Sequence, residues 1–255
     1  MVTFSANLGF LWADLSLPEA IRAAKAAQFD AVECHWPYAT PTTEITAALR
    51  DTGLEMLGLN TPKSAGGIGQ FGLCALPGHE ALARSVIDKS LDFANEIGAR
   101  CLHVMAGIAS GPAAQDSFCA ALTYACHQAK QSGITILIEP LNRYDAPGYF
   151  LSSLAQAEEI ITSLNQSNLK LMFDCYHVGR TEGDVLTQLR ARLPLIGHIQ
   201  FASIPNRQSP DQGSLNYKQV FAAIDSLGWT RPLGAEYNPG GATENSLDWM
   251  HSLKP

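Results

Sequence analysis

The sequence has little of the positive charge that binding to nucleic acid or to an anionic membrane requires. Charged residues make up only 16% of the 255 residues, the formal net charge is −7, and the basic residues form no extended run. Proteins that bind either partner carry Lys and Arg clustered on one face or in one segment. We therefore expect no nucleic acid and no membrane as partners.

Signals for export and for a disulfide framework are also missing. The six cysteines include no CxxC pair, and the segment MVTFSANLGF at the start has no basic stretch followed by an apolar stretch and small residues. A secretory signal peptide needs that order, and disulfide frameworks belong mainly to oxidising compartments. We expect a cytoplasmic protein with reduced thiols.

Two further absences bear on domain organisation and fold. No linker, low-complexity tract or shift in composition divides the chain, and no GxGxxG follows the first apolar run. That glycine pattern is typical of the doubly wound sheet that binds dinucleotides. The chain is expected to form one domain over residues 1–255, and a doubly wound sheet is disfavoured.

The chain does contain one unit eight times, in which a short apolar run is followed by a helical pattern. Short apolar runs bounded by turn residues predict buried strands, which lie at residues 3–8, 31–34, 54–59, 101–105, 135–138, 169–173, 195–201 and 233–235. The helices predicted between them cover residues 17–27, 43–52, 79–97, 115–132, 154–164, 182–193 and 217–227, with a last one from Glu244. Ser16 and Pro18 mark the start of the first helix, and glycines stand at the expected helix ends, at positions 53, 98, 133 and 228.

Eight alternating strands and helices predict a single (β/α)8 TIM barrel. A length of 255 residues is typical of this fold, and 46% apolar residues suit strands buried on both faces beneath a ring of helices. The one long irregular segment, residues 60–78, is rich in glycine, and we interpret it as a loop over the active site.

Polar residues end four successive apolar runs in the second half of the chain. They are separated by 35, 26 and 36 residues, and each gap fits one strand and one helix; the residues are Glu139, Asp174, Gln200 and Glu236. In a parallel barrel these strand ends meet at one mouth, where functional residues collect. Three carboxylates and an amide oxygen in one place need a cation, and hard oxygen ligands favour Mg²⁺ or Mn²⁺ over Zn²⁺.

Several motifs together resemble the hydroxypyruvate isomerase family of the xylose-isomerase-like TIM barrels. They extend over nearly the whole chain and read FSANL, VECHWPYAT, GLCALPG, IEPLN, FDCYH, HIQFA followed by IPNRQSPDQGSLNY, and AEYNP. The resemblance implies that Glu139, Asp174, Gln200 and Glu236 bind a divalent cation. It also implies that Glu139 and Glu236 transfer the proton when a carbonyl group migrates through an enediolate.

Four further side chains are candidates for substrate binding. The resemblance implies that His177 reaches a substrate oxygen, while His103, inside the fourth strand, lies either near the substrate or in the core as a hydrogen-bonded residue. Arg207 is the first candidate for a carboxylate of the substrate, because a guanidinium group can bind it with two hydrogen bonds. Lys63 and Arg143 are alternates for that role, and Trp12 and Trp36 either form walls of the pocket or pack against helices.

The chain departs from the family at a position that bears on the substrate. Many members carry Gly-Glu-Arg-Gly in the third loop, where this sequence has Gly69, Gln70, Phe71 and Gly72, and Ser214 replaces a common Glu. If the arginine binds the substrate carboxylate, its loss removes about 1.5 to 3 kcal/mol of binding. A 2-oxo-tetronate-like acid or a small ketose is then as suitable a substrate as hydroxypyruvate.

The predicted function is that of a metal-dependent isomerase acting on a small hydroxy-oxo acid. The alternatives are a ketose 3-epimerase, which would use the same cation and glutamate pair, and a non-catalytic sugar-binding barrel. A DNA-repair endonuclease with three zinc ions is disfavoured, because it needs more histidines and a basic groove. A homo-oligomer is left open, since barrels of this kind often pair at one rim.

Overall fold

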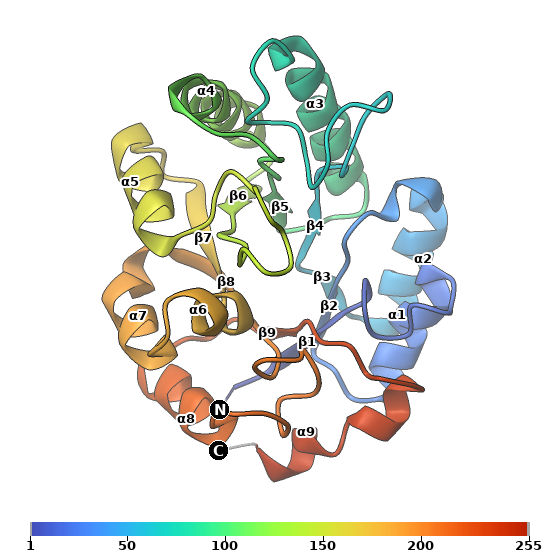
Figure 1. Ribbon diagram of the computed structural model, residues 1–255. Helices are drawn as coiled ribbons and strands as arrows, with labels where there is room; N and C mark the ends of the chain where they lie inside the picture. Colours follow the sequence, from blue (N-terminus) through green and yellow to red (C-terminus); the bar gives the residue numbers. More distant parts are fainter. Residues whose placement is uncertain (1, 254–255) are drawn as a thin grey trace.

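Parallel strands form the centre of the computed structural model, which describes residues 2–253 (Figure 1). They form one sheet in the order β3-β2-β1-β9-β8-β7-β6-β5-β4. The strands are β1 (Phe4–Asn7), β2 (Ala31–Glu33), β3 (Glu55–Met56), β4 (Gly58–Asn60), β5 (Cys101–His103), β6 (Thr135–Ile138), β7 (Leu169–Asp174), β8 (Ile196–Phe201) and β9 (Leu233–Ala235). All eight predicted strands are present, with outer boundaries shifted by two residues at most.

The sheet closes into a barrel within its third predicted strand. This strand is divided at Leu57, so that β3 pairs with β2 and β4 pairs with β5. Because β3 and β4 adjoin in the chain, the two ends of the strand order meet there, and the Cys34 N–H donates to the Gly58 carbonyl across the junction at 3.1 Å. The predicted eight-fold barrel is confirmed.

Helices surround the barrel, and most of them cover the predicted segments (Figure 1). They are α1 (Leu17–Ala26), α2 (Thr42–Thr52), α3 (Glu80–Glu96), α4 (Pro112–Ala129), α5 (Leu154–Leu164), α6 (Cys175–Thr181), α7 (Val185–Arg192), α8 (Tyr217–Ser226) and α9 (Trp249–Ser252). At the start of α1, Ser16 and Glu19 form a capping box, and Gly53 ends α2 in the left-handed conformation at φ 68°. These two ends were predicted correctly from residue type.

The helix predictions were wrong in two places. The helix expected at residues 182–193 is present as α7, but the helix before it, α6, was not predicted. It begins directly after Asp174, whose side chain accepts a hydrogen bond from the Tyr176 N–H at 2.8 Å. The helix expected from Glu244 is only a 3-10 turn (Thr243–Ser246) followed by α9. A carboxylate that caps a helix satisfies one of its free N–H groups, so Asp174 both ends a strand and starts a helix.

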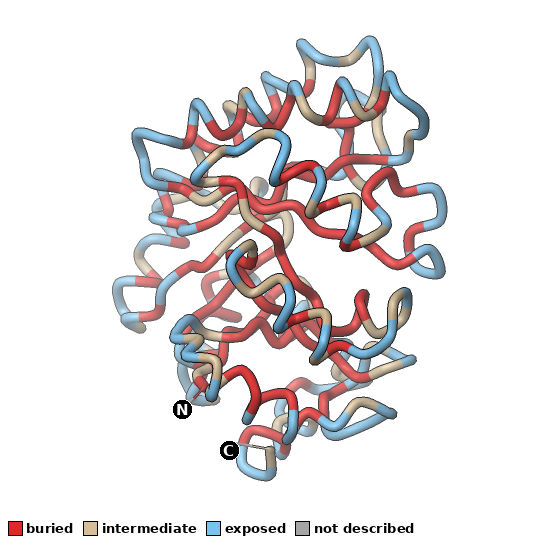
Figure 2. Tube along the Cα trace, turned by 90° about the vertical axis from the view of Figure 1, so that its left-hand side faces the viewer, coloured by how far each residue is buried: buried red, intermediate tan, exposed pale blue. Residues whose placement is uncertain are grey.

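Two separate cores hold the barrel together. The larger one lies between the strands and the helices, and the smaller one, inside the barrel, consists of Cys101, Leu137 and Met172. Buried residues follow the centre of the molecule, and the exposed ones lie mainly at its periphery (Figure 2). Side chains alternate along a strand, so the next inward positions are two residues further on, at His103, Glu139 and Asp174. The interior therefore changes from apolar to polar toward the carboxyl ends of the strands, which places the functional side chains at that end.

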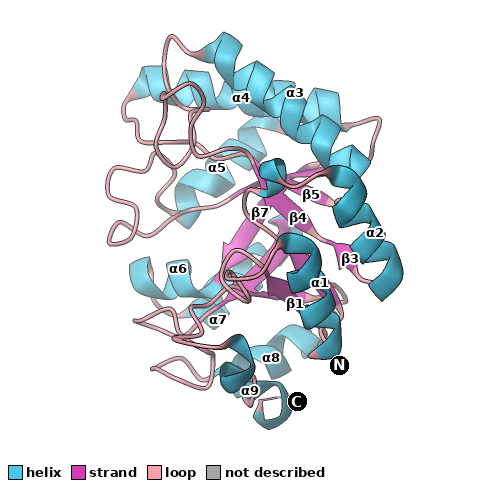
Figure 3. Ribbon diagram, turned by 90° about the vertical axis from the view of Figure 1, so that its right-hand side faces the viewer, coloured by secondary structure: helices cyan, strands magenta, loops and turns pink. Residues whose placement is uncertain are grey.

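Loops gather on the same side of the barrel (Figure 3). The predicted loop over residues 60–78 is held to the segment after β5 by a bridge between Gly72 and Ala106 and reaches the mouth through Lys63 and Phe71. Within residues 2–253, none of the helices has the length and apolar character needed to cross a membrane.

Candidate active site

The four predicted strand-end residues meet at one mouth of the barrel. Asp174 on β7 and Gln200 on β8 are direct partners in the strand pairing, Glu139 follows β6 and Glu236 follows β9. All four are buried, with exposed fractions of 6% or less. Three buried carboxylates in one place lose their hydration, and this cost must be offset by cations, ion pairs or hydrogen bonds.

A cavity of about 310 Å³ opens at this mouth. Its lining includes both predicted proton-transfer residues and all four predicted substrate-binding residues, namely Glu139, Glu236, His103, His177, Arg207 and Lys63. Of the two tryptophans considered, only Trp36 lines the cavity, whereas the Trp12 indole N–H donates to Glu244 at 2.6 Å. Gln200 lines a smaller cavity of about 20 Å³ together with Asn7, Glu33 and His198. Small-molecule sites are commonly concave pockets of this kind with a few polar groups.

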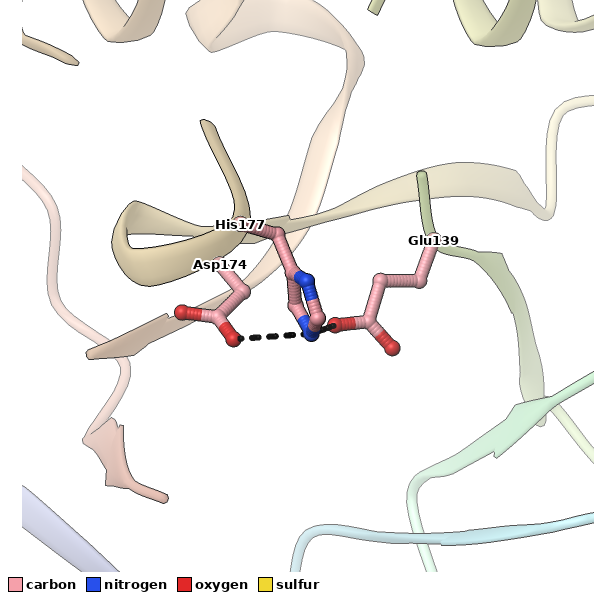
Figure 4. A group of neighbouring side chains, drawn as sticks. All are labelled: Glu139, Asp174 and His177. Carbon is pink, nitrogen blue, oxygen red and sulfur yellow. Dashed lines mark ion pairs between the residues drawn. The ribbon is translucent and has the colours of Figure 1, made fainter. Parts of the chain in front are cut away.

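Glu139 and His177, which line the cavity, form a buried polar group with Asp174 (Figure 4). One atom from each lies within 4.8 Å of the others, and the His177 Nε2 atom is 3.6 Å from Asp174 Oδ2 and 3.8 Å from Glu139 Oε1. Among residues 2–253, Glu139 Oε1, Asp174 Oδ2 and Gln200 Oε1 have no hydrogen-bond donor, although all three are buried. Unpaired buried oxygens of this kind fit a hard divalent cation.

The hydrogen bonds of His177 determine what this side chain can do. Its Nδ1 atom accepts the backbone N–H of Asn142 at 2.9 Å, and the Asn142 side-chain nitrogen lies 2.8 Å from the same atom. A neutral imidazole that accepts at one nitrogen carries its proton on the other, so the tautomer inferred from this network has an N–H at Nε2. His177 therefore presents a donor to the cavity, which suits contact with a substrate oxygen better than ligation of a metal ion.

Glu236 is held differently from Glu139 and Asp174. Its Oε2 atom is 2.6 Å from an Arg207 guanidinium nitrogen, and its Oε1 atom is 2.6 Å from His35 Nε2. Arg207 also lies 3.6 Å from Asp174 and has a positive φ of 53°, a conformation that residues other than glycine adopt rarely. The arginine considered for the substrate carboxylate is thus paired with a carboxylate of the protein in this structure.

These surroundings shift the pKa values of the carboxyl groups in opposite directions. Burial, reinforced by Glu236 and Asp174, raises the pKa of Glu139 well above its ordinary value. Burial also raises the pKa of Asp174, to about 7, although Arg207 opposes the shift. For Glu236, burial is outweighed by Arg207 and His35, which lower the pKa to about 2. The positive charge near the site thus stabilises the ionised form of Glu236. It does not offset the cost of burying the charges of Glu139 and Asp174.

Two histidines that line the cavity, His103 and His177, have lowered pKa values. Burial lowers the pKa of His103 to about 3, and burial together with Arg207 lowers the pKa of His177 to about 3. His103 is 3% exposed and neither ring nitrogen has a hydrogen-bond partner within the described part of the chain, although Nδ1 is 3.6 Å from Glu139 Oε2. Of the two interpretations of His103, a position near the substrate matches this geometry better than a hydrogen-bonded core residue.

The sequence interpretation missed the polar residues at the first two strand ends. These are Asn7, Glu33 and His35, together with their neighbour His198 on β8. Glu33 ends a short apolar strand in the same way as Glu139 does, so the signal that identified the second half of the mouth was present in the first half as well.

A comparison with known families identifies the group to which the chain is related. The model of the xylose isomerase-like TIM barrel family matches residues 21–253. The chain belongs to this family. The predicted resemblance is therefore confirmed.

Named relatives are similar over nearly the whole chain. A 2-oxo-tetronate isomerase of Cupriavidus necator is 38% identical over 98% of this chain and 98% of its own. A Homo sapiens protein that carries the hydroxypyruvate isomerase name is 35% identical over 98% of this chain and 94% of its own.

Solved structures show the same similarity of fold. A structure described as a family 2 AP endonuclease from Brucella melitensis has a TM-score of 0.94 and 32% identity, covering 100% of both chains. A D-psicose 3-epimerase has a TM-score of 0.78 and 17% identity over 96% of this chain and 89% of its own, a similarity that shows the fold alone.

Proposed function

We propose that this protein is a metal-dependent isomerase of a small hydroxy-oxo acid, in which Glu139 and Glu236 transfer the proton. The relatives named as isomerases support the reaction class. The observation that carries the proposal is the pair of buried glutamates that line one cavity from strands β6 and β9. Hydroxypyruvate and 2-oxo-tetronate are the substrates to which the relatives' names point.

Oxygen atoms of this chain are suited to hold the cation. Glu139, Asp174 and Gln200 each offer a buried oxygen that has no donor within residues 2–253, and Glu236 would join them when Arg207 shifts away. Oxygen-only ligands favour Mg²⁺ or Mn²⁺. When bound, such an ion stabilises negative charge that develops on the carbonyl and hydroxyl oxygens of the substrate.

The two glutamates move the proton in this proposal. One glutamate, as a carboxylate, removes the proton from the hydroxyl-bearing carbon beside the carbonyl, which gives an enediolate. The other glutamate, in its protonated form, gives its proton to the former carbonyl carbon, and the hydroxyl proton passes to the former carbonyl oxygen. His177 donates a hydrogen bond from Nε2 to a substrate oxygen, and the surrounding apolar lining limits access of water. No redox cofactor takes part in such a carbonyl migration.

Lys63 is the residue proposed to bind the carboxylate of the substrate. Its ammonium nitrogen lies 3.9 Å above the Trp36 ring, both residues line the cavity, and it forms no ion pair with any residue from 2 to 253. Arg207, by contrast, is already paired with Glu236. Phe71 occupies the cavity where many family members have an arginine, so the lysine supplies the positive charge on that loop.

Two other activities are less well supported. The endonuclease name of the Brucella melitensis protein belongs to that protein, and the net charge of −7 on this chain opposes binding to DNA. A ketose 3-epimerase would use the same proton chemistry on a neutral sugar, and the experiment below separates it from the isomerase.

The decisive experiment follows the substrate protons by ¹H NMR in D₂O. The Mg²⁺-loaded protein is incubated with hydroxypyruvate, with 2-oxo-tetronate and with ketoses, before and after EDTA. We expect metal-dependent loss of the α-proton signal of one of the acids, together with migration of its carbonyl group. Inversion of a ketose at C3 would instead establish the epimerase, and exchange in no compound despite bound metal would overturn the enzyme assignment in favour of a non-catalytic barrel.

A further inference from the structure

Glu33 is a buried carboxylate, at the end of β2, that the proposed chemistry does not use. It is 4% exposed and has three partners on other strands. Its Oε1 atom accepts from Gln200 Nε2 at 2.7 Å and from Asn7 Nδ2 at 3.0 Å, and its Oε2 atom lies 2.7 Å from His198 Nε2. A buried carboxylate with a donor at each oxygen is fixed in place, because any movement would leave polar groups unpaired.

A glycine on β9, one of the two strands between β2 and β8, allows Glu33 to reach its partners on β8. Gly234 on β9 is paired with Gln200 on β8, and a Cβ atom at position 234 would lie 2.6 Å from Glu33 Oε1 and 2.7 Å from Oε2. The same atom would lie 2.8 Å from the Gln200 Cγ atom. The missing side chain therefore provides the space in which the carboxylate of β2 meets the amide of β8 inside the barrel.

The contact determines which way the Gln200 amide faces. A primary amide has one end that donates hydrogen bonds and one end that accepts them. Glu33 binds the donor end, so Oε1 of Gln200 is directed away from it, and this buried oxygen has no donor within the described chain. With the amide reversed, an NH₂ group would replace the oxygen, and an amide nitrogen cannot ligate a hard cation.

Asn7 extends the same network to Glu236. Its Nδ2 group donates both to Glu33 Oε1 at 3.0 Å and to Glu236 Oε1 at 3.2 Å. Its Oδ1 atom accepts the Gly9 N–H at 2.9 Å, which fixes the orientation of the Asn7 amide. Glu33 is therefore linked to a second residue of the proposed cation site.

We infer that Glu33 is a positioning residue that orients the Gln200 amide so that its oxygen faces the cation site. The inference rests on the proposed function only in requiring that the site binds a divalent cation. Groups that orient metal ligands commonly change metal affinity by about 10- to 100-fold when they are removed. Glu33 acts through Gln200 and does not touch the ion or the substrate.

The test measures the Mn²⁺ dissociation constant of the metal-free protein by isothermal titration calorimetry. We expect Glu33→Ala to weaken Mn²⁺ binding by about 10- to 100-fold. Glu33→Gln keeps an oxygen that can accept from Gln200, so its affinity should stay within about threefold of the wild type. In a Gln200→Ala background the ligand oxygen is gone, and Glu33→Ala should then weaken binding by no more than about threefold.

A second variant tests the inference if Glu33→Ala does not fold. The exchange Glu33→Gln with Gln200→Glu keeps a donor and an acceptor in contact and places a carboxylate at the cation site, so Mn²⁺ should bind at least as tightly as in the wild type. Loss of more than about tenfold in the exchanged protein would overturn the inference.

The remaining outcomes separate this inference from the proposed function. Unchanged affinity in folded Glu33→Ala, or an equal loss with and without Gln200, would overturn the positioning role while leaving proton exchange by the wild type intact. A wild-type protein that binds no Mn²⁺ would overturn both proposals.

Discussion

The two halves of the barrel mouth hold their acidic side chains in different ways. In the second half, Glu139 and Asp174 each have a buried oxygen that has no donor from residues 2–253. In the first half, both oxygens of Glu33 are hydrogen-bonded, and Glu236, next to that half, is paired with Arg207 and His35. Similar residues at similar strand ends therefore differ in how completely their charge is compensated.

The difference indicates that the two halves of the mouth have different roles. A buried carboxylate oxygen without a donor retains the capacity to bind a cation or a proton, whereas Glu33, with hydrogen bonds at both oxygens, holds its neighbours in place. Glu236 is also paired at both oxygens, and in the proposed chemistry it becomes available when Arg207 shifts away. We therefore expect substitutions in the second half to remove chemistry or metal binding outright, and substitutions in the first half to change geometry and affinity by smaller factors.

The largest effect is expected for the two proposed proton-transfer residues, Glu139 and Glu236. Glu139→Gln and Glu236→Gln should each lower kcat by about 10²- to 10⁴-fold, because an amide cannot take up or release the proton. The measurement is the rate of α-proton loss by ¹H NMR at saturating substrate and Mg²⁺. Glu55→Gln, at an exposed carboxylate paired with Arg100, is the matched control, and full activity of either test variant with metal bound would remove that residue from the proton path.

The second-largest effect is expected for Asp174, whose substitution should weaken metal binding. Asp174→Asn replaces a buried oxygen that has no donor within residues 2–253, and we expect Mn²⁺ affinity to fall by more than about 100-fold, beyond the usual effect of a residue that only orients a ligand. Isothermal titration calorimetry measures the Mn²⁺ affinity. The control is Asp51→Asn, the same chemical change at a side chain that is 52% exposed; equal affinity in the two variants would contradict a cation site at Asp174.

A smaller effect is expected for Lys63, on the loop of the first half. Lys63→Met should raise KM for the acid substrate about tenfold with little change in kcat, the lower end of what a hydrogen bond to a charged group contributes, because the lysine is exposed. Lys63→Arg keeps the charge and should restore most of the affinity. Steady-state kinetics decide the matter, and an unchanged KM in Lys63→Met would show that another group binds the carboxylate.

The smallest effects should separate the two tryptophans of the first half. Trp36→Phe weakens the ring beneath Lys63 and should raise KM about two- to fivefold, which corresponds to a cation–π contribution of about 0.5 to 1 kcal/mol. Trp12→Phe removes the hydrogen bond to Glu244 and should lower the free energy of unfolding by about 1 kcal/mol without changing KM. Urea unfolding and steady-state kinetics are measured on both variants. An equal change in KM for Trp12→Phe and Trp36→Phe would contradict the different roles assigned to the two tryptophans.

The order of the secondary structure and one half of the site could be predicted from local patterns. Strands buried on both faces need short apolar runs, helices need caps, and both signals are contained within a few neighbouring residues. The helix α6 was missed because it is short and begins inside the motif FDCYH, directly after a strand. Asp174 was therefore recognised as the end of a strand but not as the cap of the helix that follows. The site residues identified in this way are close together in the structure, and their roles in binding and catalysis stay predictions.

The sequence by itself determined the barrel and the positions at which polar side chains end its strands, because these depend on the spacing of apolar residues along the chain. Only the tertiary structure decided which oxygens are paired and which are left without a donor. Those pairings join residues that are distant in sequence: Glu33 meets His198 across 165 positions, and Asn7 meets Glu236 across 229. Whether a buried carboxylate can bind a cation depends on such partners, and the closure of the sheet brings them together.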